Sequence, residues 1–466
     1  MLRLHDTATG QVADLVPREP GKLSMYVCGP TVYEAPHIGH GRAMLVHDLL
    51  RRYLEWCGVE VRHVSNVTDI DDKIIQRAAE EGRPPSAVAA EQEAAWWDAV
   101  DRLGVARPTD TPHATDYVEA MVEAVADLAA AGFAYETGDG VYLEVGRVDG
   151  YGLLARQPLE SLRAGARVES APEKRSPLDF ALWKKARPGE PSWASPWGDG
   201  RPGWHTECVV MSLDLLGDGF DLHTGGLDLR FPHHENERAQ AVALGRPFAR
   251  HWMHHGMVET GGEKMSRSLR NFVTLTDLLA GTDPRAYRLL VLRSHYRKPM
   301  EVTPETISDA ERGIERLDSL HRRTSALGGT EPLRPDPGAH SRFVAAMDDD
   351  LDTPGATASV FDLVRRAHSA LDAGDAEGGR RLAATVAELS GALGLGLRSG
   401  EDAVGPYDAE LVRRRDEARS ARDFGAADAL RDQLTARGWV VEDGPAGTRI
   451  RRAAGGQEHP PLAPPP

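Results

Sequence analysis

The sequence has no run of about 18 consecutive apolar residues, the length that a membrane-spanning helix needs. Its first residues, MLRLHDTATGQVADLV, lack the order of a signal peptide, in which basic residues precede an apolar stretch. Three cysteines are too few, and odd in number, for a disulfide framework. We therefore expect no membrane association and a cytoplasmic protein whose thiols stay reduced and free to bind metal.

Positive charge is also scarce. Lysine and arginine total 55 against 71 acidic residues, so the net charge is −16. This balance argues against broad nucleic-acid binding, because phosphate contacts need a basic surface. A local site is still compatible with it, since residues 407–452 hold ten arginines against nine acidic residues.

The 466 residues allow about three domains of roughly 150 residues each. Residues 22–28 and 59–67 favour strands. Between them we expect a helix from about residue 40 to Gly58. Its helical spacing is carried by Leu45, Leu49, Tyr53 and Trp56. Strand, helix and strand in this order are typical of a βαβ unit in a parallel sheet.

Further along, glycine and proline separate the expected elements. Residues 140–200 indicate an insertion with short strands. Helices are expected at 116–136, 303–327 and 341–395. Linkers are expected at 328–340 and 398–406, and a disordered tail from Ala453. Between the second linker and the tail we expect a charged helix pair followed by strands near Trp439–Glu442 and Thr448–Arg451.

The segment GPTVYEAPHIGHGR places His37, Gly39 and His40 where the first strand gives way to the helix. A helix N-terminus offers unpaired N–H groups and partial positive charge to a phosphate. Glycine lets a nucleotide approach the backbone, and the two imidazoles can donate to phosphate oxygens. Alone, the H-x-G-H pattern equally fits two surface histidines near a turn.

A second segment, Lys264-Met265-Ser266-Arg267-Ser268, follows Gly261-Gly262. A glycine-hinged loop with two cations can clamp a triphosphate, although such a run alone is usually a solvated loop. Together, in this order and about 225 residues apart, the two segments resemble the two signatures of class I aminoacyl-tRNA synthetases.

A candidate metal set consists of Cys28, Cys208, His233 and Glu237. Pro232 suits a first helical position, which puts His233 and Glu237 four apart on one helix face. Two sulfurs, an imidazole nitrogen and a carboxylate oxygen fit zinc. Each residue also has an ordinary alternative, such as a buried structural cysteine, which is how we interpret Cys57. Four protein ligands would also suit a closed structural site.

Several ordered blocks resemble the signatures of cysteinyl-tRNA synthetases from about residue 2 to residue 452. They are MYVCGPTVYEAPHIGH, NVTDIDDKII, GRPGWHTEC, LHTGGLDLRFPHHENE, GEKMSRSLRNF, DPRAYRLLVLRSHYR, MDDDLDTPGA and ARDFGAADALRDQLTARGWVVEDGPAGTRIRR. The resemblance implies one zinc per chain on the candidate metal set, with the substrate thiolate as a further ligand. Metal ligation would reject serine more strongly than an apolar pocket, which achieves about 10²-fold.

The resemblance also implies that Thr68, Trp204 and His223 line the amino-acid pocket and that Asp69 or Asp71 holds the ammonium group. It implies a two-step reaction in which L-cysteine and ATP, accompanied by Mg²⁺, form an adenylate that tRNA(Cys) then accepts. Charge stabilisation would come from His37, His40, Lys264 and Arg267. ATP contacts would come from these four residues and from Gly29, Gly39 and Ser266. Positioning and electrostatics would suffice, without a protein nucleophile.

We thus expect an α/β protein. It has a Rossmann-type parallel-sheet catalytic domain with an insertion, followed by a helical bundle and a small C-terminal anticodon-binding module, and we expect a monomer. The catalytic halves would be 1–115 and 201–250, flanking a connective insertion at 116–200. The remaining segments would be a stem-contact region at 251–312, the bundle at 313–400, the anticodon-binding module at 401–452 and a tail at 453–466. In that module, the arginines and Trp439 would contact or stack on loop bases, although core packing of Trp439 is an equal alternative.

The chain departs from the family pattern at six positions. With the residue usual in the family in parentheses, they are Arg267 (lysine), Arg270 (glycine), Thr224 (glycine), His47 (phenylalanine), His255 (asparagine) and Gly41 (alanine). Arginine keeps the charge of lysine but is bulkier and planar. These changes leave the ligand set intact and are compatible with a paralogue of altered kinetics or acceptor.

Three other functions compete with a cysteine–tRNA ligase. The first is a related ligase that passes activated cysteine to a small amine, as in the mycothiol pathway, but that family lacks the C-terminal end present in this chain. The second is a non-catalytic tRNA-binding or regulatory module, against which the histidine pair, Lys264 and the metal set argue. The third is a small nucleotidyltransferase, which has no use for the metal set or the C-terminal domains.

Overall fold

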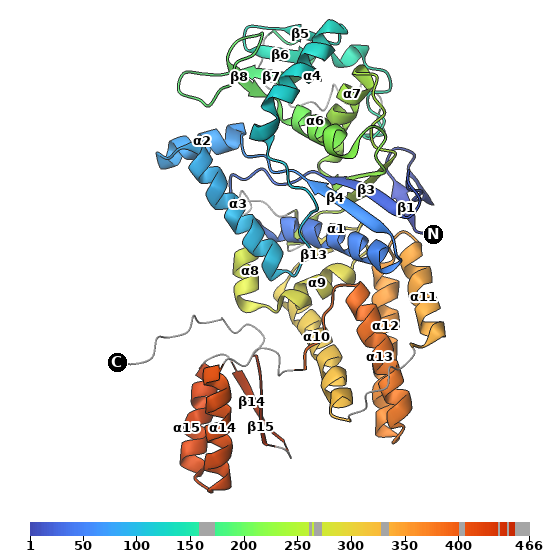
Figure 1. Cartoon of the computed structure of the whole chain (residues 1–466), viewed down its shortest axis with the longest axis vertical. Coiled ribbons are helices and arrows are strands. Elements are labelled where there is room, and N and C mark those ends of the chain that lie inside the picture. The colour runs from blue at the N-terminus through green and yellow to red at the C-terminus, as the bar shows by residue number, and fades with distance from the viewer. Residues whose placement is uncertain are drawn as a thin grey trace.

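The computed structural model describes residues 1–157, 173–260, 263–264, 273–327, 335–399, 406–436, 439–444 and 447–452. Its central sheet has four parallel strands in the order β10-β9-β3-β4, of which β3 and β4 are labelled in Figure 1. They are β3 (Lys22–Val27), β4 (Glu60–Ser65), β9 (Leu222–Gly226) and β10 (His251–His255). Helix α1 (Ile38–Trp56) connects β3 to β4. The expected strand, helix and strand are confirmed, and so is the α/β fold class.

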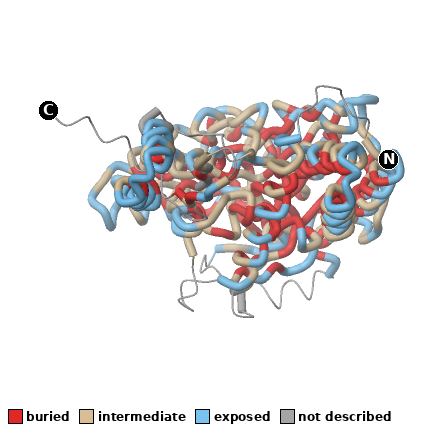
Figure 2. The backbone as a smooth tube through the Cα atoms, turned by 90° about the horizontal axis from the view of Figure 1, so that it is seen from below, coloured by how far each residue is buried: buried red, intermediate tan, exposed pale blue. Residues whose placement is uncertain are grey.

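The sheet is covered on both faces because its strands are apolar on both faces. Met25 on β3 joins the core beside α1, whereas its neighbour Tyr26 joins a second core beside α6. Figure 2 shows the buried segments running through the middle of the molecule. The helices that follow β4 or cover the sheet are α2 (Asp72–Glu81), α3 (Pro85–Arg102), α6 (Trp204–Leu216) and α7 (Glu235–Ala243).

An α+β segment separates the early strands from α6. It contains η1 (Ala114–Tyr117), α4 (Val118–Ala130) and η2 (Val145–Arg147), with an antiparallel sheet of β5 (Ala134–Glu136), β6 (Gly140–Leu143), β7 (Phe180–Lys185) and β8 (Gly200–Pro202). The expected helix 116–136 is wrong at its end. Gly132 adopts φ +78°, which stops the helix and turns the chain into β5.

The short elements around the central sheet complete this part of the chain. They are β1 (Arg3–Asp6), β2 (Gln11–Asp14), η3 (Arg230–His234), β11 (Val258–Thr260), β12 (Glu263–Lys264), α8 (Leu275–Gly281), α9 (Pro284–Leu292) and β13 (Met300–Glu301). β12, β11 and β13 form a separate three-stranded sheet. β12 of this sheet leads into residues 264–268, which we call the second nucleotide segment; the first is residues 29–42.

Four helices then pack on one another: α10 (Pro304–Ser325), α11 (Pro337–Asp348), α12 (Thr353–Asp372) and α13 (Ala376–Ala392). The expected linker 328–340 is shorter than predicted, because Asp336 caps α11 and Pro337 occupies its first helical position. Residues 328–334 lie outside the described part of the chain, as do 400–405 of the second linker and the tail from Ala453.

The C-terminal module consists of α14 (Pro406–Ser420), α15 (Phe424–Ala436), β14 (Trp439–Gly444) and β15 (Gly447–Arg452). The expected helix pair and strand pair are confirmed. Trp439 is 2% exposed and belongs to the core of this module. Core packing is therefore its role, and stacking on bases is not.

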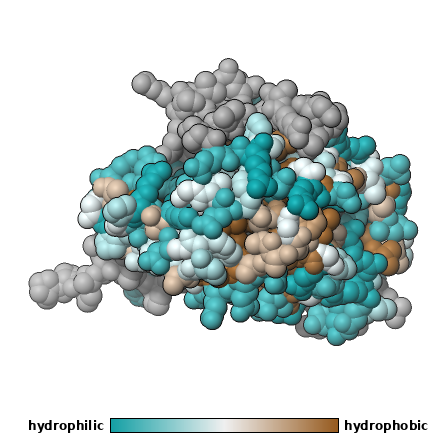
Figure 3. Space-filling model, turned by 90° about the horizontal axis from the view of Figure 1, so that it is seen from above, coloured by the Kyte–Doolittle hydropathy of each residue, from teal (hydrophilic) through white to brown (hydrophobic). Residues whose placement is uncertain are grey.

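Hydrophilic residues cover most of the surface seen in Figure 3. Among the residues that the structure describes, no helix is both long and apolar enough to cross a bilayer.

A buried ion-pair network fixes α1 against the elements beside it. Asp48 accepts from Arg52 Nε at 2.7 Å, from the Ala106 amide at 2.9 Å and from Arg288, which is 2% exposed. Burial would raise the pKa of Asp48, but the Arg288 and Arg52 guanidiniums outweigh it and hold that pKa below its usual value. The stability that this charge provides is therefore complete above the usual carboxyl range and lost as pH falls through the lowered pKa.

Replacing Asp48 with asparagine should lower stability by about 3–5 kcal/mol, because it leaves the Arg288 charge buried without a counter-charge. Thermal unfolding followed by circular dichroism measures this. The matched control is Asp101→Asn, which removes a solvent-exposed carboxylate from Arg107 and should leave the melting temperature close to that of the parent. Equal losses in both variants would show that the buried pair has no special role.

Candidate metal and nucleotide site

The carboxyl ends of the central strands meet at one edge, where parallel sheets bind ligands. Cys28 directly follows β3, and Asn66 directly follows β4. The Gly29 amide donates to Asn66 Oδ1 at 2.9 Å. A Cβ on Gly29 would lie 1.6 Å from the Asn66 carbonyl oxygen, so only glycine allows this approach. The observed role of Gly29 is thus to bring the two strand ends together.

The four expected metal ligands converge although they come from β3, α6, η3 and α7. Their ligand atoms all lie within 4.8 Å of one another. The Sγ atoms of Cys28 and Cys208 are 3.7 Å apart, Cys208 Sγ is 3.6 Å from His233 Nε2, and Cys28 Sγ is 3.4 Å from Glu237 Oε1. Tetrahedral zinc would place such pairs about 3.8, 3.6 and 3.5 Å apart, from its usual bond lengths. The donor types and these three spacings therefore fit zinc, whereas His233 Nε2 and Glu237 Oε1 are in hydrogen-bond contact at 2.8 Å, closer than the roughly 3.4 Å of two zinc ligands.

One buried carboxylate in this cluster is paired with two histidines. Glu237 is fully buried and lies 2.8 Å from His233 Nε2 and 2.6 Å from His223 Nε2. Burial alone would raise the pKa of Glu237, but the two histidines hold it well below its usual value. Burial likewise opposes charge on His233, yet Glu237 and Cys208 raise its pKa to about 10. The cluster thus keeps a positive charge at the place where a metal cation would replace a proton.

The geometry also brings together a second, overlapping set of donors: Cys28, His223, His234 and Glu237. His234 Nε2 lies 3.3 Å from Cys28 Sγ, while His234 Nδ1 lies 2.8 Å from His254 Nε2. Sequence reasoning missed His234. Its place directly after His233 in FPHHENE was the available signal.

Aromatic rings support the first set. The Trp204 ring stacks on His233 with centroids 3.9 Å apart and planes 20° apart, and Trp204 is 36% exposed. On its other side, His233 Nδ1 lies 2.7 Å from His205 Nδ1. These neighbours fix the orientation of the His233 ring, which is how outer groups orient metal ligands.

The structure places the other two expected pocket residues near the same cluster. His223 is fully buried, stacks on Trp252, and has no partner for Nδ1 among the described residues. Thr68 is buried and donates to Glu207 Oε2 at 2.6 Å. Burial raises the pKa of Glu207 well above its usual value. Glu207, beside Cys208 in sequence, is a residue that sequence reasoning missed.

The two aspartates suggested for the ammonium group have local structural partners. Asp69 accepts from the amide and hydroxyl of Thr115 at 3.0 and 2.5 Å. Asp71 caps α2 by accepting from the Lys73 amide at 2.9 Å.

The two histidines of the first nucleotide segment cap α1 reciprocally. His37 Nδ1 accepts from the His40 amide, and His40 Nδ1 accepts from the His37 amide, both at 3.3 Å. Their rings stack with centroids 3.7 Å apart. Burial lowers the pKa of His37 to about 4 and that of His40 to about 3, so both are neutral at pH 7. Because each Nδ1 is an acceptor, the proton of each neutral ring lies on Nε2. Each ring thus retains one donor, Nε2–H.

The second nucleotide segment has backbone pairing at both ends, and its exit pairs with the first nucleotide segment. On entry, Lys264 in β12 pairs with Glu259 in β11. On exit, the Ile38 amide donates to the Val273 carbonyl at 3.2 Å, and the Leu275 amide donates to the Pro36 carbonyl at 2.8 Å. Residues 265–272, which include Ser266, Arg267 and Arg270, lie outside the described residues, and so does the Lys264 side chain.

Three departures from the family pattern meet beneath this edge of the sheet. Thr224 Oγ1 lies 3.2 Å from His47 Nε2, and the His47 and His255 rings lie edge to face with centroids 5.5 Å apart. A buried threonine hydroxyl needs a hydrogen-bond partner, which phenylalanine at position 47 would not supply. Gly41 lies against α8 and α9, where a Cβ would approach Leu275 and Tyr287 to about 3 Å.

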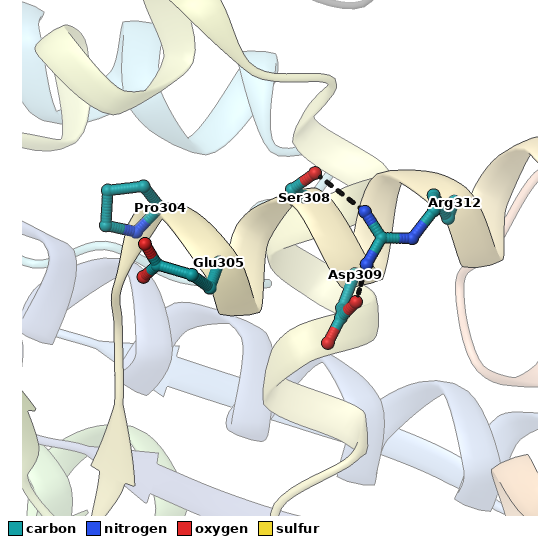
Figure 4. A pocket seen from close by; sticks show the side chains of 5 residues that line it. All are labelled: Pro304, Glu305, Ser308, Asp309 and Arg312. Carbon is teal, nitrogen blue, oxygen red and sulfur yellow. Dashed lines mark hydrogen bonds and ion pairs between the residues drawn. The ribbon is translucent and has the colours of Figure 1, made fainter.

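A surface depression of about 300 Å³ on α10 shares no residue with this site (Figure 4). It is lined by one helix only, and its Arg312 donates to Ser308 and Asp309. Nothing in it matches the expected chemistry.

Comparison with known proteins bears on the identity of the chain. Residues 14–312 match the family model described as tRNA synthetases class I (C) catalytic domain, residues 342–398 match the DALR domain, and residues 405–451 match the cysteinyl-tRNA ligase anticodon binding domain. The cysteine–tRNA ligase of Halorhodospira halophila is 46% identical over 463 residues, and that of Alkalilimnicola ehrlichii is 47% identical over 465 residues. Each alignment covers 97% of this chain and 100% of the relative.

Among solved structures, Mycobacterium tuberculosis methionyl-tRNA synthetase superposes with a TM-score of 0.60 at 16% identity, covering 87% of this chain and 96% of that one. This likeness shows the fold alone. The near full-length identity to the ligases shows the family, and it confirms the family resemblance and the ligase activity expected from the sequence. The chain therefore belongs to the cysteine–tRNA ligases, a family of class I aminoacyl-tRNA synthetases.

Proposed function

We propose that this ligase activates L-cysteine with ATP to cysteinyl-adenylate and transfers the cysteinyl group to the 3′ end of tRNA(Cys). The observation that carries this proposal is the convergence of Cys28, Cys208, His233 and Glu237 at the end of the strand that leads into the His37–His40 helix cap. A thiol-selective donor set and a nucleotide motif thus share one sheet edge.

Zinc would be held by these four residues, at one ion per chain. When bound, it supplies a Lewis acid that favours a thiolate over the harder, less acidic serine hydroxyl. The protein side chains do the rest of the selection. Trp204 stacks on His233 at the exposed side of the cluster, and buried His223 and Thr68 complete the surrounding wall.

The nucleotide would be bound through neutral donors and side-chain cations. The Nε2–H groups of His37 and His40 donate hydrogen bonds to phosphate oxygens. This stabilisation requires no proton transfer from either ring. Lys264 and Arg267, together with Ser266, Gly39 and Mg²⁺, neutralise the triphosphate and the leaving pyrophosphate. The cysteine carboxylate attacks the α-phosphorus and pyrophosphate leaves. The terminal ribose hydroxyl of tRNA then attacks the adenylate carbonyl, the bond from that carbonyl to the phosphate oxygen breaks, and AMP leaves. Asp69 and Asp71 remain the candidates for the ammonium group.

We propose the same domain boundaries as those expected from the sequence: catalytic halves at 1–115 and 201–250, an insertion at 116–200, a stem-contact region at 251–312, a bundle at 313–400 and an anticodon-binding module at 401–452. We also propose that the protein is a cytoplasmic monomer. The match of residues 405–451 to an anticodon binding domain supports tRNA as acceptor rather than a small amine. Within this module, Arg415 is 2% exposed and bonds Asp443 and Thr448. Arg415 therefore stabilises the module, and tRNA contacts fall to its exposed arginines.

Replacing Cys208 with serine should reduce bound zinc from about one per chain to near zero, because a hydroxyl is a far weaker zinc ligand than a thiolate. Cysteine-dependent ATP–pyrophosphate exchange should fall at least about 100-fold. Metal analysis by mass spectrometry and the exchange assay measure both. Cys57→Ser is the matched control. The interpretation of Cys57 as a buried structural cysteine is wrong, because this residue follows the last residue of α1 and is exposed. It lies outside the cluster, so its replacement should change neither value. Full zinc content and activity in Cys208→Ser would refute the site.

Two substitutions of His40, the N3 residue of the capping box, test its donor role while an acceptor for the His37 amide is kept. Asparagine can replace the Nδ1 acceptor but not Nε2–H, so His40→Asn should lower the exchange rate about 100-fold. Glutamine is a favoured N3 residue of a capping box, and its longer side chain brings an amide donor nearer the Nε2 position. His40→Gln should therefore keep the melting temperature and retain more activity than His40→Asn. The reverse order of activities would contradict the assigned tautomer.

A further inference from the structure

Arg42 is a buried cation for which neither the sequence pattern nor the catalytic scheme above provides a role. It lies on α1, two residues after His40, and is 1% exposed. Burial lowers the pKa of Arg42 to about 10, so it still carries its charge at pH 7. Its hydrogen-bond partners are all backbone carbonyl oxygens: Met257 at 2.8 Å, Tyr296 at 3.1 Å, and Lys298 and His295 beside them.

Burying a guanidinium that has only carbonyl partners costs desolvation free energy that an ion pair would offset. Among the residues that the structure describes, no carboxylate pairs with Arg42, and its Nε has no partner. An apolar side chain of similar size would avoid this desolvation cost. What arginine adds is a rigid fork that can hold several carbonyl groups in fixed relative positions.

The carbonyls that Arg42 holds belong to two chain segments that meet at this point. Met257 lies between β10 and β11, whereas Tyr296 and Lys298 precede β13. The Gly256 amide donates to the Tyr296 carbonyl at 2.8 Å, and the Met300 amide donates to the Met257 carbonyl at 3.0 Å. A Cβ on Gly256 would lie 2.4 Å from the Lys298 oxygen, so the junction has no room for a side chain.

This junction leads directly to the second nucleotide segment. β11 begins at Val258, directly after Met257, and pairs with β12. In this pairing Glu259 of β11 lies opposite Lys264 of β12. α1, labelled in Figure 1, contacts β11. The same helix begins directly after His37, which caps it, and carries His40 in its first turn. Arg42 is therefore the side chain that ties the helix of the first nucleotide segment to the strand that enters the second.

We propose that Arg42 is a positioning residue for amino-acid activation, which sets the Lys264 strand at a fixed position relative to the His37–His40 pair. The proposal rests on the proposed function, since it assigns both segments to one ATP. Placement matters because an error of about 1 Å in a reacting geometry can cost about 100-fold in rate. Lysine at position 42 would keep the charge and lose the fork, so the proposal separates geometry from charge.

The test compares Arg42→Lys and Gly256→Ala with Arg288→Lys in the full-length chain. Arg288 is the matched control, because it is also buried, contacts α1 through Asp48, and donates to the Leu103 and Gly104 carbonyls. The readouts are kcat and the two KM values of cysteine-dependent ATP–pyrophosphate exchange, melting temperature and zinc content. Gly256→Ala disturbs the same junction with Arg42 intact, and it carries the test if Arg42→Lys does not fold.

We expect both junction variants to lower kcat about 10- to 100-fold, with zinc content and the KM for cysteine unchanged. Arg288→Lys should lower the melting temperature and leave kcat within about twofold of the parent. A kcat near that of the parent in a folded junction variant would overturn the proposal, and so would an equal loss of kcat in Arg288→Lys. Absence of cysteine-dependent exchange in the parent protein would instead refute the proposed function itself.

Discussion

The structure depends on one buried interaction, the bridge that Glu237 makes between His223 and His233 beside two thiols. A carboxylate removed from water must keep a positive partner close to it. The partners come from β3, α6, β9 and the turn before α7, which are up to 209 residues apart in the chain. The cluster therefore exists only in the folded chain, where the sheet and its helices bring these residues together. The need to pair this buried carboxylate explains why the residues around the cluster are both buried and polar.

The nucleotide half of the site follows a different physical principle. Its histidines are neutral, and they stabilise the helix that they begin. Reciprocal capping fixes their tautomers, and the first turn of α1 contains no acidic residue. Each ring therefore carries its N–H donor on Nε2, at the positive end of the helix. In the proposed function, the cations for ATP belong to a segment whose exit pairs with the start of the same helix through Val273 and Leu275. Neutral donors and cations are thus divided between two parts of the chain.

Local patterns were sufficient to predict β3, α1 and β4, because their apolar spacing is set by the faces that they bury. The convergence of Cys28, Cys208, His233 and Glu237 was predictable from the family resemblance of the blocks that hold them, because the donor types alone left ordinary structural roles open. Long-range contacts were not predictable. The second donor set through His234, the burial of Trp439 and the contact between Thr224 and His47 each depend on strands or helices far apart in sequence. The helix expected at 116–136 ended early because one glycine took a left-handed conformation.

The central claim is that the donor set selects the substrate by binding its thiolate. Cobalt(II) in place of zinc provides the most direct measurement, because each thiolate ligand adds to the sulfur-to-cobalt charge-transfer absorption. With the full-length protein and no ATP, cysteine should increase this absorption by about half, from two thiolates to three, whereas serine should leave it unchanged. An unchanged spectrum with cysteine, or the same increase with serine, would contradict the claim.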